Sequence, residues 1–258
     1  MLESILLGIL QGLTEFLPIS SSGHLVIAQS LLPGFQEPAV LFDVVLHAGT
    51  LAAVLAYFRR DLMQIISGVL DPGEEGLRLP FLLAVGTIPA ALVGGGFRYQ
   101  IEALFETPKA ASWGLFLTSL LLWMAWKTGR GGKKRSFESL TLAGALLIGG
   151  FQAVAIIPGL SRSGATIAAG IFLGLSGKDA ARFSFLLSIP AIVGAVLLQA
   201  GGISGTHNLY LFLAGGVAAA LAGWASIAFL MRLLAREILL PFAVYCFAAG
   251  SISLLFLV

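Results

Sequence analysis

The chain has 258 residues, of which 58% are hydrophobic and only 11% are charged. Soluble domains carry about 25% charged residues, and the net charge of +2 is too small to indicate a nucleic-acid partner. Cys246 is the one cysteine, so no disulfide framework exists. Several apolar stretches reach the roughly 20 residues that a helix needs to cross the hydrocarbon of a bilayer. These features exclude an ordinary soluble domain and predict a multi-pass protein of the lipid bilayer.

The N-terminal segment has no basic region and carries Glu3, so we expect it to be part of the fold and not a cleaved signal peptide. Its apolar residues 4–17 end at Pro18 and a small polar cluster, and a second short apolar piece follows. Two short apolar pieces around a polar, glycine-containing break are typical of a re-entrant hairpin, predicted here at 4–32. Full spans are predicted at 40–58, 79–97 and 110–126, with an interfacial helix at 61–70.

A basic linker at 128–136 divides the chain into a first half, 1–127, and a second half, 137–258. The second half again has a broken apolar segment, at 140–175, followed by predicted spans at 180–200, 209–231 and 239–257. The halves match at an offset of 141 residues, and the register is lost beyond the last of these pairs: Gly8 and Gly149, Gln11 and Gln152, Ser20 and Ser161, Ser22 and Ser163, Gly23 and Gly164, Phe42 and Phe183. Three spans per half is an odd number, so the second half runs inverted. We therefore predict an all-α integral membrane fold of two inverted-topology repeats, each a re-entrant helix hairpin plus three transmembrane helices.

The basic residues support this arrangement, because cytoplasmic loops of membrane proteins carry an excess of Lys and Arg. With the N-terminus outside, counting crossings leaves only Arg98 and Lys109 of the 15 basic residues outside, and Arg162 in the second break. The 12 on the inside are Arg59, Arg60, Arg78, Lys127, Arg130, Lys133, Lys134, Arg135, Lys178, Arg182, Arg232 and Arg236. Both termini then face outward, and the two hairpin breaks meet near the midplane. Broken helices of inverted repeats at that depth are typical of transporter binding sites.

The first break carries an acidic residue that needs an explanation. Gln11 and Glu15 stand four residues apart, so they share one helix face. Glu15 lies in an otherwise apolar segment, which is costly unless the carboxylate is paired, protonated or bound to a cation. Either it pins the hairpin by hydrogen bonds, or it is held for a metal ion or for proton transfer.

Ser20, Ser21, Ser22 and His24 follow, where a new helix begins after the proline. Backbone N–H groups and the positive dipole end of a helix start attract phosphate. The serine hydroxyls add hydrogen-bond donors or a nucleophile, and His24 is suited to hold or move a proton. For Ser20 and Ser22, helix capping is an equally good interpretation.

Arg162 is the most informative single residue. An arginine at membrane depth costs about 2.5–3.5 kcal/mol on insertion scales, and its planar fork suits phosphate or carboxylate. It lies beside Ser161, Ser163 and Gly164, and Thr166 either hydrogen-bonds near it or caps its helix. An ion pair with Glu15 that only locks the hairpins together is the structural alternative to a phosphate site.

The offset alignment shows that the two breaks differ in chemistry. Ser21 falls opposite Arg162, and Glu15 and His24 fall opposite apolar residues. One half therefore supplies acid, serine and histidine, and the other supplies the cation. A symmetric transporter has no evident need for this division, whereas a catalytic site does.

Two further polar positions are less informative. Asp43 and His47, four residues apart on the first full span, either line an entrance or form an interfacial pair. His207 lies in a glycine-rich outer loop, where we expect it to be solvated.

Two long runs resemble the motifs of a known family, the bacitracin-resistance type of undecaprenyl-diphosphate phosphatase. They are Gln11-Gly12-Leu13-Thr14-Glu15-Phe16-Leu17-Pro18-Ile19-Ser20-Ser21-Ser22-Gly23-His24 and Pro158-Gly159-Leu160-Ser161-Arg162-Ser163-Gly164-Ala165-Thr166. The resemblance extends over essentially the whole chain in length, span order and motif position. It implies hydrolysis of undecaprenyl diphosphate to undecaprenyl phosphate and inorganic phosphate, which recycles the lipid carrier for peptidoglycan and other envelope polymers and gives bacitracin resistance.

The resemblance also implies where the protein acts and which residues act. It places the protein in a bacterial plasma (inner) membrane with the active site open to the outer face, with a divalent cation, Mg²⁺ or Ca²⁺, as cofactor. The implied catalytic residues are Glu15, Ser21, His24 and Arg162, the diphosphate-binding residues are Arg162, Ser20, Ser22, Ser161, Ser163, Gly164 and Thr166, and the metal ligands are Glu15 and Gln11. Where a glutamine stands first, as Gln11 does, a two-carboxylate metal site is in doubt. Ser21 either attacks phosphorus or orients the attacking water.

A polyprenyl-phosphate flippase or transporter built on the inverted repeat is the main alternative function. A membrane phosphatase of the histidine-nucleophile class needs more arginine, histidine and aspartate than the chain offers. A homodimer is left open.

Overall fold

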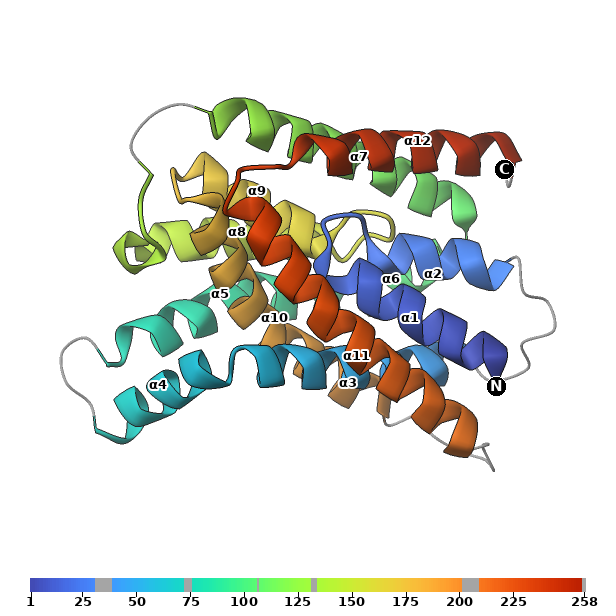
Figure 1. Ribbon diagram of the computed structural model, residues 1–258, viewed down its shortest axis with the longest axis horizontal. Helices are drawn as coiled ribbons and strands as arrows, with labels where there is room; N and C mark the ends of the chain where they lie inside the picture. Colours follow the sequence, from blue (N-terminus) through green and yellow to red (C-terminus); the bar gives the residue numbers. More distant parts are fainter. Residues whose placement is uncertain (31–38, 72–75, 106, 131–133, 201–208, 257–258) are drawn as a thin grey trace.

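The chain folds into apolar helices that pack side by side (Figure 1). The structure, a computed structural model, describes residues 1–30, 39–71, 76–105, 107–130, 134–200 and 209–256. Within these ranges the secondary structure is helical, with one isolated bridge between Arg135 and Leu175. The fold class predicted from composition, an all-helical chain, is confirmed at this level.

Each predicted hairpin contains two short helices around a break. The first has α1 (Leu2–Phe16) and α2 (Ser21–Ser30), and the second has α8 (Leu142–Val154) and α9 (Arg162–Phe172). The C-terminal limit of the first hairpin, predicted at residue 32, lies outside the described residues.

The second helix of each hairpin begins where a serine caps it. Ser20 Oγ accepts a hydrogen bond from the Gly23 N–H (3.3 Å), and Ser161 Oγ accepts one from the Gly164 N–H (3.0 Å). Such a cap satisfies one of the backbone N–H groups that a helix start leaves without an intrahelical partner. The capping interpretation of Ser20 is therefore confirmed.

Helices occupy all six of the predicted full spans. They are α3 (Ala39–Tyr57), α5 (Arg78–Gly96), α7 (Pro108–Thr128), α10 (Gly177–Ala200), α11 (Leu209–Leu234) and α12 (Leu240–Phe256). The predicted interfacial helix is α4 (Arg59–Leu70), and the short turn η1 spans Phe137–Ser139. The helix α6 (Arg98–Phe105) was not predicted; that segment had been assigned to an outer loop.

Fewer of these helices are long and apolar enough to cross a membrane than the sequence predicted. Among the described residues, α5, α10 and α11 meet both conditions alone, and α3 meets them together with α4, from which it is bent by 76°. The helix α12 has 17 residues, and Lys, Ser and Thr side chains lower the hydropathy of α7. By length and composition alone, three helices, or four if the bent pair is one span, pass this test, and the six predicted spans stay a prediction.

Small residues let the helices approach closely around the hairpins. α1 packs on α11, and α8 packs on α5. A Cβ atom at Gly8 would lie 2.3 Å from the Gly215 carbonyl oxygen, and one at Gly149 would lie 2.2 Å from that of Gly86. Contacts of this kind between small residues are typical of helix packing in membranes, where burying apolar surface gives little driving force.

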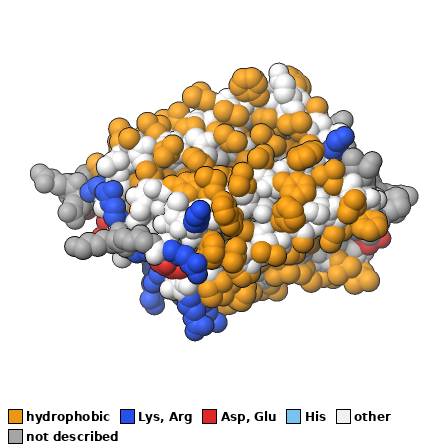
Figure 2. All heavy atoms as spheres, turned by 90° about the horizontal axis from the view of Figure 1, so that it is seen from above, with side chains coloured by type: hydrophobic (Ala, Val, Ile, Leu, Met, Phe, Trp, Pro, Cys, Tyr) orange, Lys and Arg blue, Asp and Glu red, His pale blue; other side chains and the backbone are white. Residues whose placement is uncertain are grey.

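The surface separates into an apolar belt and a basic end. In Figure 2 hydrophobic side chains cover most of the visible face, and Lys and Arg gather at its left end. Large hydrophobic side chains such as Trp113, Leu117 and Phe247 are exposed. In a soluble protein, this exposure would promote aggregation. α1 begins and α12 ends at the opposite end of the molecule (Figure 1).

Candidate functional site

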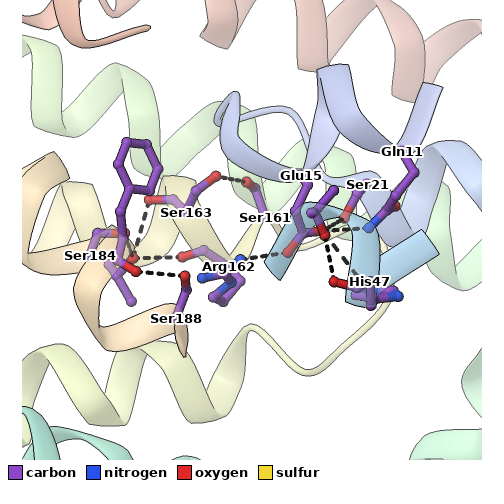
Figure 3. Close-up of polar contacts among 12 residues, drawn as sticks. Gln11, Glu15, Ser21, His47, Ser161, Arg162, Ser163, Ser184 and Ser188 are labelled. Carbon is purple, nitrogen blue, oxygen red and sulfur yellow. Dashed lines mark hydrogen bonds and ion pairs between the residues drawn. The ribbon is translucent and has the colours of Figure 1, made fainter. Parts of the chain in front are cut away.

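The breaks of the two hairpins meet at an ion pair between their charged residues. Arg162, the first residue of α9, donates from Nη2 to Glu15 Oε1, near the end of α1, over 2.5 Å (Figure 3). Ser163 Oγ also donates to the Leu17 carbonyl oxygen over 3.1 Å. The side chain of Glu15 is only 5% exposed and that of Arg162 only 17%. The predicted meeting of the two breaks is confirmed, and the ion pair with Glu15 that the sequence left open as the structural alternative is formed.

The second carboxylate oxygen of Glu15 collects hydrogen bonds from the first hairpin. Gln11 Nε2 donates to Oε2 over 3.0 Å, and Ser21 Oγ donates to the same atom over 2.5 Å. Ser21 is the first residue of α2, so its short side chain reaches back across the break to α1. The carboxylate therefore draws on the hydroxyl proton of Ser21, which makes that oxygen more nucleophilic.

Two polar atoms at this cluster are buried and have no partner among the described residues. They are Gln11 Oε1 and Arg162 Nη1. A buried donor or acceptor without a partner costs about 1–3 kcal/mol, so such atoms commonly mark a place where a ligand binds. The guanidinium nitrogen suits an anion such as phosphate, and the amide oxygen suits a cation.

The remaining serines form two matching pairs. Ser20 Oγ lies 3.3 Å from Ser22 Oγ, and Ser161 Oγ lies 3.1 Å from Ser163 Oγ. Ser20 also has a φ of 70°, a left-handed conformation that costs free energy in a non-glycine residue and is found at functional sites. These hydroxyls hold the shape of the two breaks, and their contact with a substrate stays a prediction.

Thr166 lies one turn beyond Arg162. Its Oγ1 donates to the Arg162 carbonyl oxygen (2.8 Å) and lies 2.6 Å from Ser184 Oγ on α10. Of the two interpretations of Thr166, the structure supports the hydrogen bond near Arg162.

His24 makes contacts on the side of the hairpin that faces α12. Its Nδ1 lies 2.7 Å from the Ser20 carbonyl oxygen and its Nε2 lies 2.7 Å from the Tyr245 hydroxyl, whose ring stacks on the imidazole. A carbonyl oxygen only accepts, so Nδ1 donates and, in the neutral ring, Nε2 accepts from Tyr245. The contact with Ser21 that a direct proton transfer would need does not occur among these hydrogen bonds.

Sequence reasoning did not identify two residues of this region, and it did not place a third at the carboxylate. Tyr245 is the first. The second is Thr118 on α7, which joins the Gly159 carbonyl oxygen (2.9 Å) and the Ser161 N–H (2.8 Å). The third is His47 on α3, whose Nε2 lies 3.9 Å from Glu15 Oε2. His47 had been expected at an entrance or in an interfacial pair; the structure brings it to the carboxylate.

Asp43, the other member of that pair, lies farther out. Its Oδ1 accepts a hydrogen bond from Gln29 Nε2 over 2.8 Å. His207 lies outside the described residues.

The site combines the Ser21 hydroxyl, the Glu15 carboxylate and the Arg162 guanidinium. Ser21 and Arg162 each contact one oxygen of Glu15, so the carboxylate brings the hydroxyl and the guanidinium into one cluster. The described residues contain no group of three or more His, Cys, Asp or Glu placed to hold a metal ion. A cation here would therefore depend on one carboxylate helped by neutral donors.

The chain is similar to known proteins over nearly its full length. Residues 4–252 match the profile of the family described as bacitracin resistance protein BacA. A Syntrophotalea carbinolica protein named undecaprenyl-diphosphatase is 47% identical over 257 residues, covering 97% of this chain and 96% of that protein. Relatives of the same name from Desulfosudis oleivorans (45% over 269 residues, 98% and 97% covered) and Geobacter sulfurreducens (43% over 265 residues, 99% and 98% covered) are similar to the same extent.

Proposed function

Because the chain belongs to the bacitracin resistance protein BacA family, we propose that it hydrolyses undecaprenyl diphosphate to undecaprenyl phosphate and inorganic phosphate. This reaction recycles the lipid carrier of peptidoglycan and envelope polymers in a bacterial plasma membrane, and it gives bacitracin resistance. One observation carries the proposal. Ser21 and Arg162, from two different hairpins, converge on the two oxygens of Glu15.

The diphosphate binds where the two helix starts meet. Arg162 Nη1 has no partner among the described residues, so it is available to a phosphate oxygen while Nη2 stays on Glu15. The N-terminal ends of α2 and α9 add their positive dipole ends. Phosphoryl transfer depends mainly on positioning and on stabilising charge, which these groups supply in a buried site.

Glu15 is placed to take the proton of the attacking group. If Ser21 attacks, its Oγ forms a bond to the terminal phosphorus, the P–O bond to the bridging oxygen breaks, and the hydroxyl proton passes to Glu15 Oε2. Water then cleaves the phosphoserine and releases inorganic phosphate. If water attacks directly, Ser21 and Glu15 orient it and Glu15 takes its proton. The contact between Ser21 Oγ and Glu15 at 2.5 Å supports both routes.

A divalent cation, Mg²⁺ or Ca²⁺, fits the residues around Glu15. Gln11 Oε1 is a buried oxygen that lacks a donor among the described groups, which is the kind of atom that a hard cation binds. Gln11 and Glu15 would hold the ion, and the ion would neutralise phosphate oxygens as charge develops on the leaving group. Because position 11 is a glutamine and not an acid, the Glu15 carboxylate is the one negative charge that these two residues offer the ion.

His24 acts on the far side of the hairpin. Tyr245 and the Ser20 carbonyl orient its ring, and a histidine oriented in this way is suited to carry a proton to or from solvent. Its described contacts include neither Ser21 nor Glu15, so it takes no proton directly from either of them.

The proposed fold is the inverted repeat, with the two hairpins re-entrant. Two pairs of residues 141 positions apart support it. Ser20 and Ser161 cap the second helix of each hairpin, and Gly8 and Gly149 each bring the first helix of a hairpin against the backbone of a span in the other half.

The proposed topology places the basic end in the cytoplasm and both termini outside, with the site open to the outer face. Two observations support this orientation. Basic residues follow the C-terminal ends of α3 and α7. The start of α1 and the end of α12 lie at the opposite end of the molecule (Figure 1). The repeats are then 1–127 and 137–258, joined by the linker 128–136.

Phosphate release from undecaprenyl diphosphate by the purified protein in detergent tests the function. We expect metal-dependent release by the wild type and a loss of at least about 100-fold in kcat for Ser21→Ala, since one group placed for the transition state contributes this much. Ser251→Ala, whose hydroxyl binds only within its own helix among the described contacts, is the matched control. Trapping phosphate on Ser21 would establish the covalent route. Wild-type protein that releases no phosphate but moves the lipid between leaflets would establish the flippase instead.

A further inference from the structure

His47 directs its Nε2 toward the Glu15 carboxylate. Its Nδ1 lies 2.7 Å from the Asp43 carbonyl oxygen, one turn earlier in α3. Because a carbonyl oxygen only accepts hydrogen bonds, Nδ1 carries the hydrogen. In the neutral ring Nε2 is then the basic nitrogen, and it is the atom that lies 3.9 Å from Glu15 Oε2.

The Nε2 of a neutral ring and a carboxylate oxygen repel each other, so either a proton on Nε2 or a cation between the two atoms stabilises this contact. The distance of 3.9 Å is too long for a direct hydrogen bond. Two ligands that each lie about 2.1 Å from one metal ion are separated by roughly 3.0–4.2 Å, depending on the angle at the ion. The separation of Nε2 and Oε2 falls within this interval.

A third donor belongs to the same cluster. Gln11 binds Glu15 Oε2 through Nε2, so its Oε1, on the same amide group, is held beside the carboxylate, and it is buried with no partner in the described part of the chain. Metal-binding histidines usually donate their other ring N–H to a carbonyl or carboxylate, which fixes the ring. The contact of His47 with Asp43 has that form.

We propose that His47 is a nitrogen ligand of the divalent cation, with Glu15 and Gln11 as its oxygen ligands. The inference rests on the proposed function, because it places at this site the cation that the reaction uses. The His47 side chain is 31% exposed, so the ion would face the entrance and keep positions open for water and substrate oxygen. Arg162, on the other carboxylate oxygen, stays free for phosphate.

The ligand set predicts which ion binds best. An imidazole nitrogen and one carboxylate favour Mn²⁺, Co²⁺ and Zn²⁺ relative to Ca²⁺, which prefers oxygen ligands only. Replacing His47 by an acid would give an all-oxygen set with two negative charges. His47→Asp is therefore expected to shift the preference toward Ca²⁺.

The test uses full-length protein in detergent with Mn²⁺ and no substrate. Pulsed electron paramagnetic resonance detects a directly bound imidazole nitrogen through its coupling to Mn²⁺. We expect this coupling in the wild type and in His24→Gln, the control for the other histidine of the site. We expect it to be absent in His47→Gln and His47→Asp, with Mn²⁺ affinity at least about tenfold weaker in His47→Gln.

Two results would overturn the assignment: Mn²⁺ bound to the wild type without nitrogen coupling, or coupling that persists in both His47 variants. His47→Asp keeps an oxygen ligand, so it still reports on the site if His47→Gln does not fold. Failure of the proposed function is a separate result, since it appears as absent phosphate release while the Mn²⁺ spectra stay the same.

Discussion

Thr118 holds the break that carries Arg162, although it is remote from that break in sequence. It lies on α7, is buried, and its hydroxyl contacts two backbone groups of the break, the Gly159 carbonyl oxygen and the Ser161 N–H. Ser161 in turn caps α9, whose first residue is Arg162. We predict that Thr118→Val, which keeps the shape of the side chain and removes the hydroxyl, both destabilises the protein and displaces the guanidinium.

The size of the effect follows from the two groups left without a partner. Each buried backbone group that loses its hydrogen bond costs about 1–3 kcal/mol, so the substitution should cost about 2–6 kcal/mol. For a protein of this size 1 kcal/mol corresponds to about 2–4 °C in Tm, which gives a fall of roughly 4–24 °C. A shift of Arg162 by a fraction of an ångström would in addition lower kcat by about 10–100-fold, because charge stabilisation depends on position.

The assay is thermal unfolding in detergent together with phosphate release from undecaprenyl diphosphate. Thr118→Ser, which keeps the hydroxyl, should recover most of the loss in both measurements. Thr128→Val is the matched control, because the Thr128 hydroxyl is exposed and contacts only carbonyl groups of its own helix. Wild-type Tm and kcat in Thr118→Val would refute the reasoning.

Three other variants test separate parts of the structure. Gly149→Ala should lower Tm by several degrees because its Cβ would meet a backbone carbonyl at 2.2 Å, whereas Gly150→Ala, with nothing within 4 Å, should not. Tyr245→Phe should lower kcat by about tenfold and leave Tm almost unchanged, since it removes the hydroxyl that orients His24; a wild-type kcat would exclude that role for Tyr245. Gln152→Leu should raise Tm and keep wild-type phosphate release, because both amide atoms of Gln152 are buried and without partners in the described chain; a lower Tm would show that the amide has a partner.

The chemistry of the site could be predicted because its main residues lie in two short runs. Glu15 and Ser21 are close in sequence, and an acid in an apolar helix or an arginine in an apolar break stands out at once. The hydrophobic pattern also placed every helix that forms the site. It did not predict α6, because Arg98–Phe105 is only eight residues long and three of them are polar or charged, Arg98, Gln100 and Glu102.

The partners of these residues could not be predicted, because their positions depend on how distant helices pack. Thr118 and Tyr245 are ordinary polar residues of membrane helices, and neither has a charge or a motif to distinguish it. His47 was visible as a histidine four residues from an acid, but the pattern indicated a pair with Asp43. In the structure the imidazole contacts the Asp43 backbone and points to Glu15, which is a tertiary contact between α3 and α1.

The proposed repeat explains why Ser21 and Arg162, two unlike residues at equivalent positions, meet at one carboxylate. Ser21 and Arg162 are the first residues of α2 and α9, and both contact Glu15 at 2.5 Å, one on each oxygen. A two-fold framework brings two equivalent helix starts to one point, and identical side chains there would give two serines or two arginines. Two serines would leave the phosphate charge without a fixed cation, and two arginines would leave no nucleophile. Unlike residues on a like framework bring a hydroxyl and a guanidinium to the two oxygens of one carboxylate, so that one half supplies the proposed nucleophile and the other supplies the fixed cation that phosphoryl transfer uses.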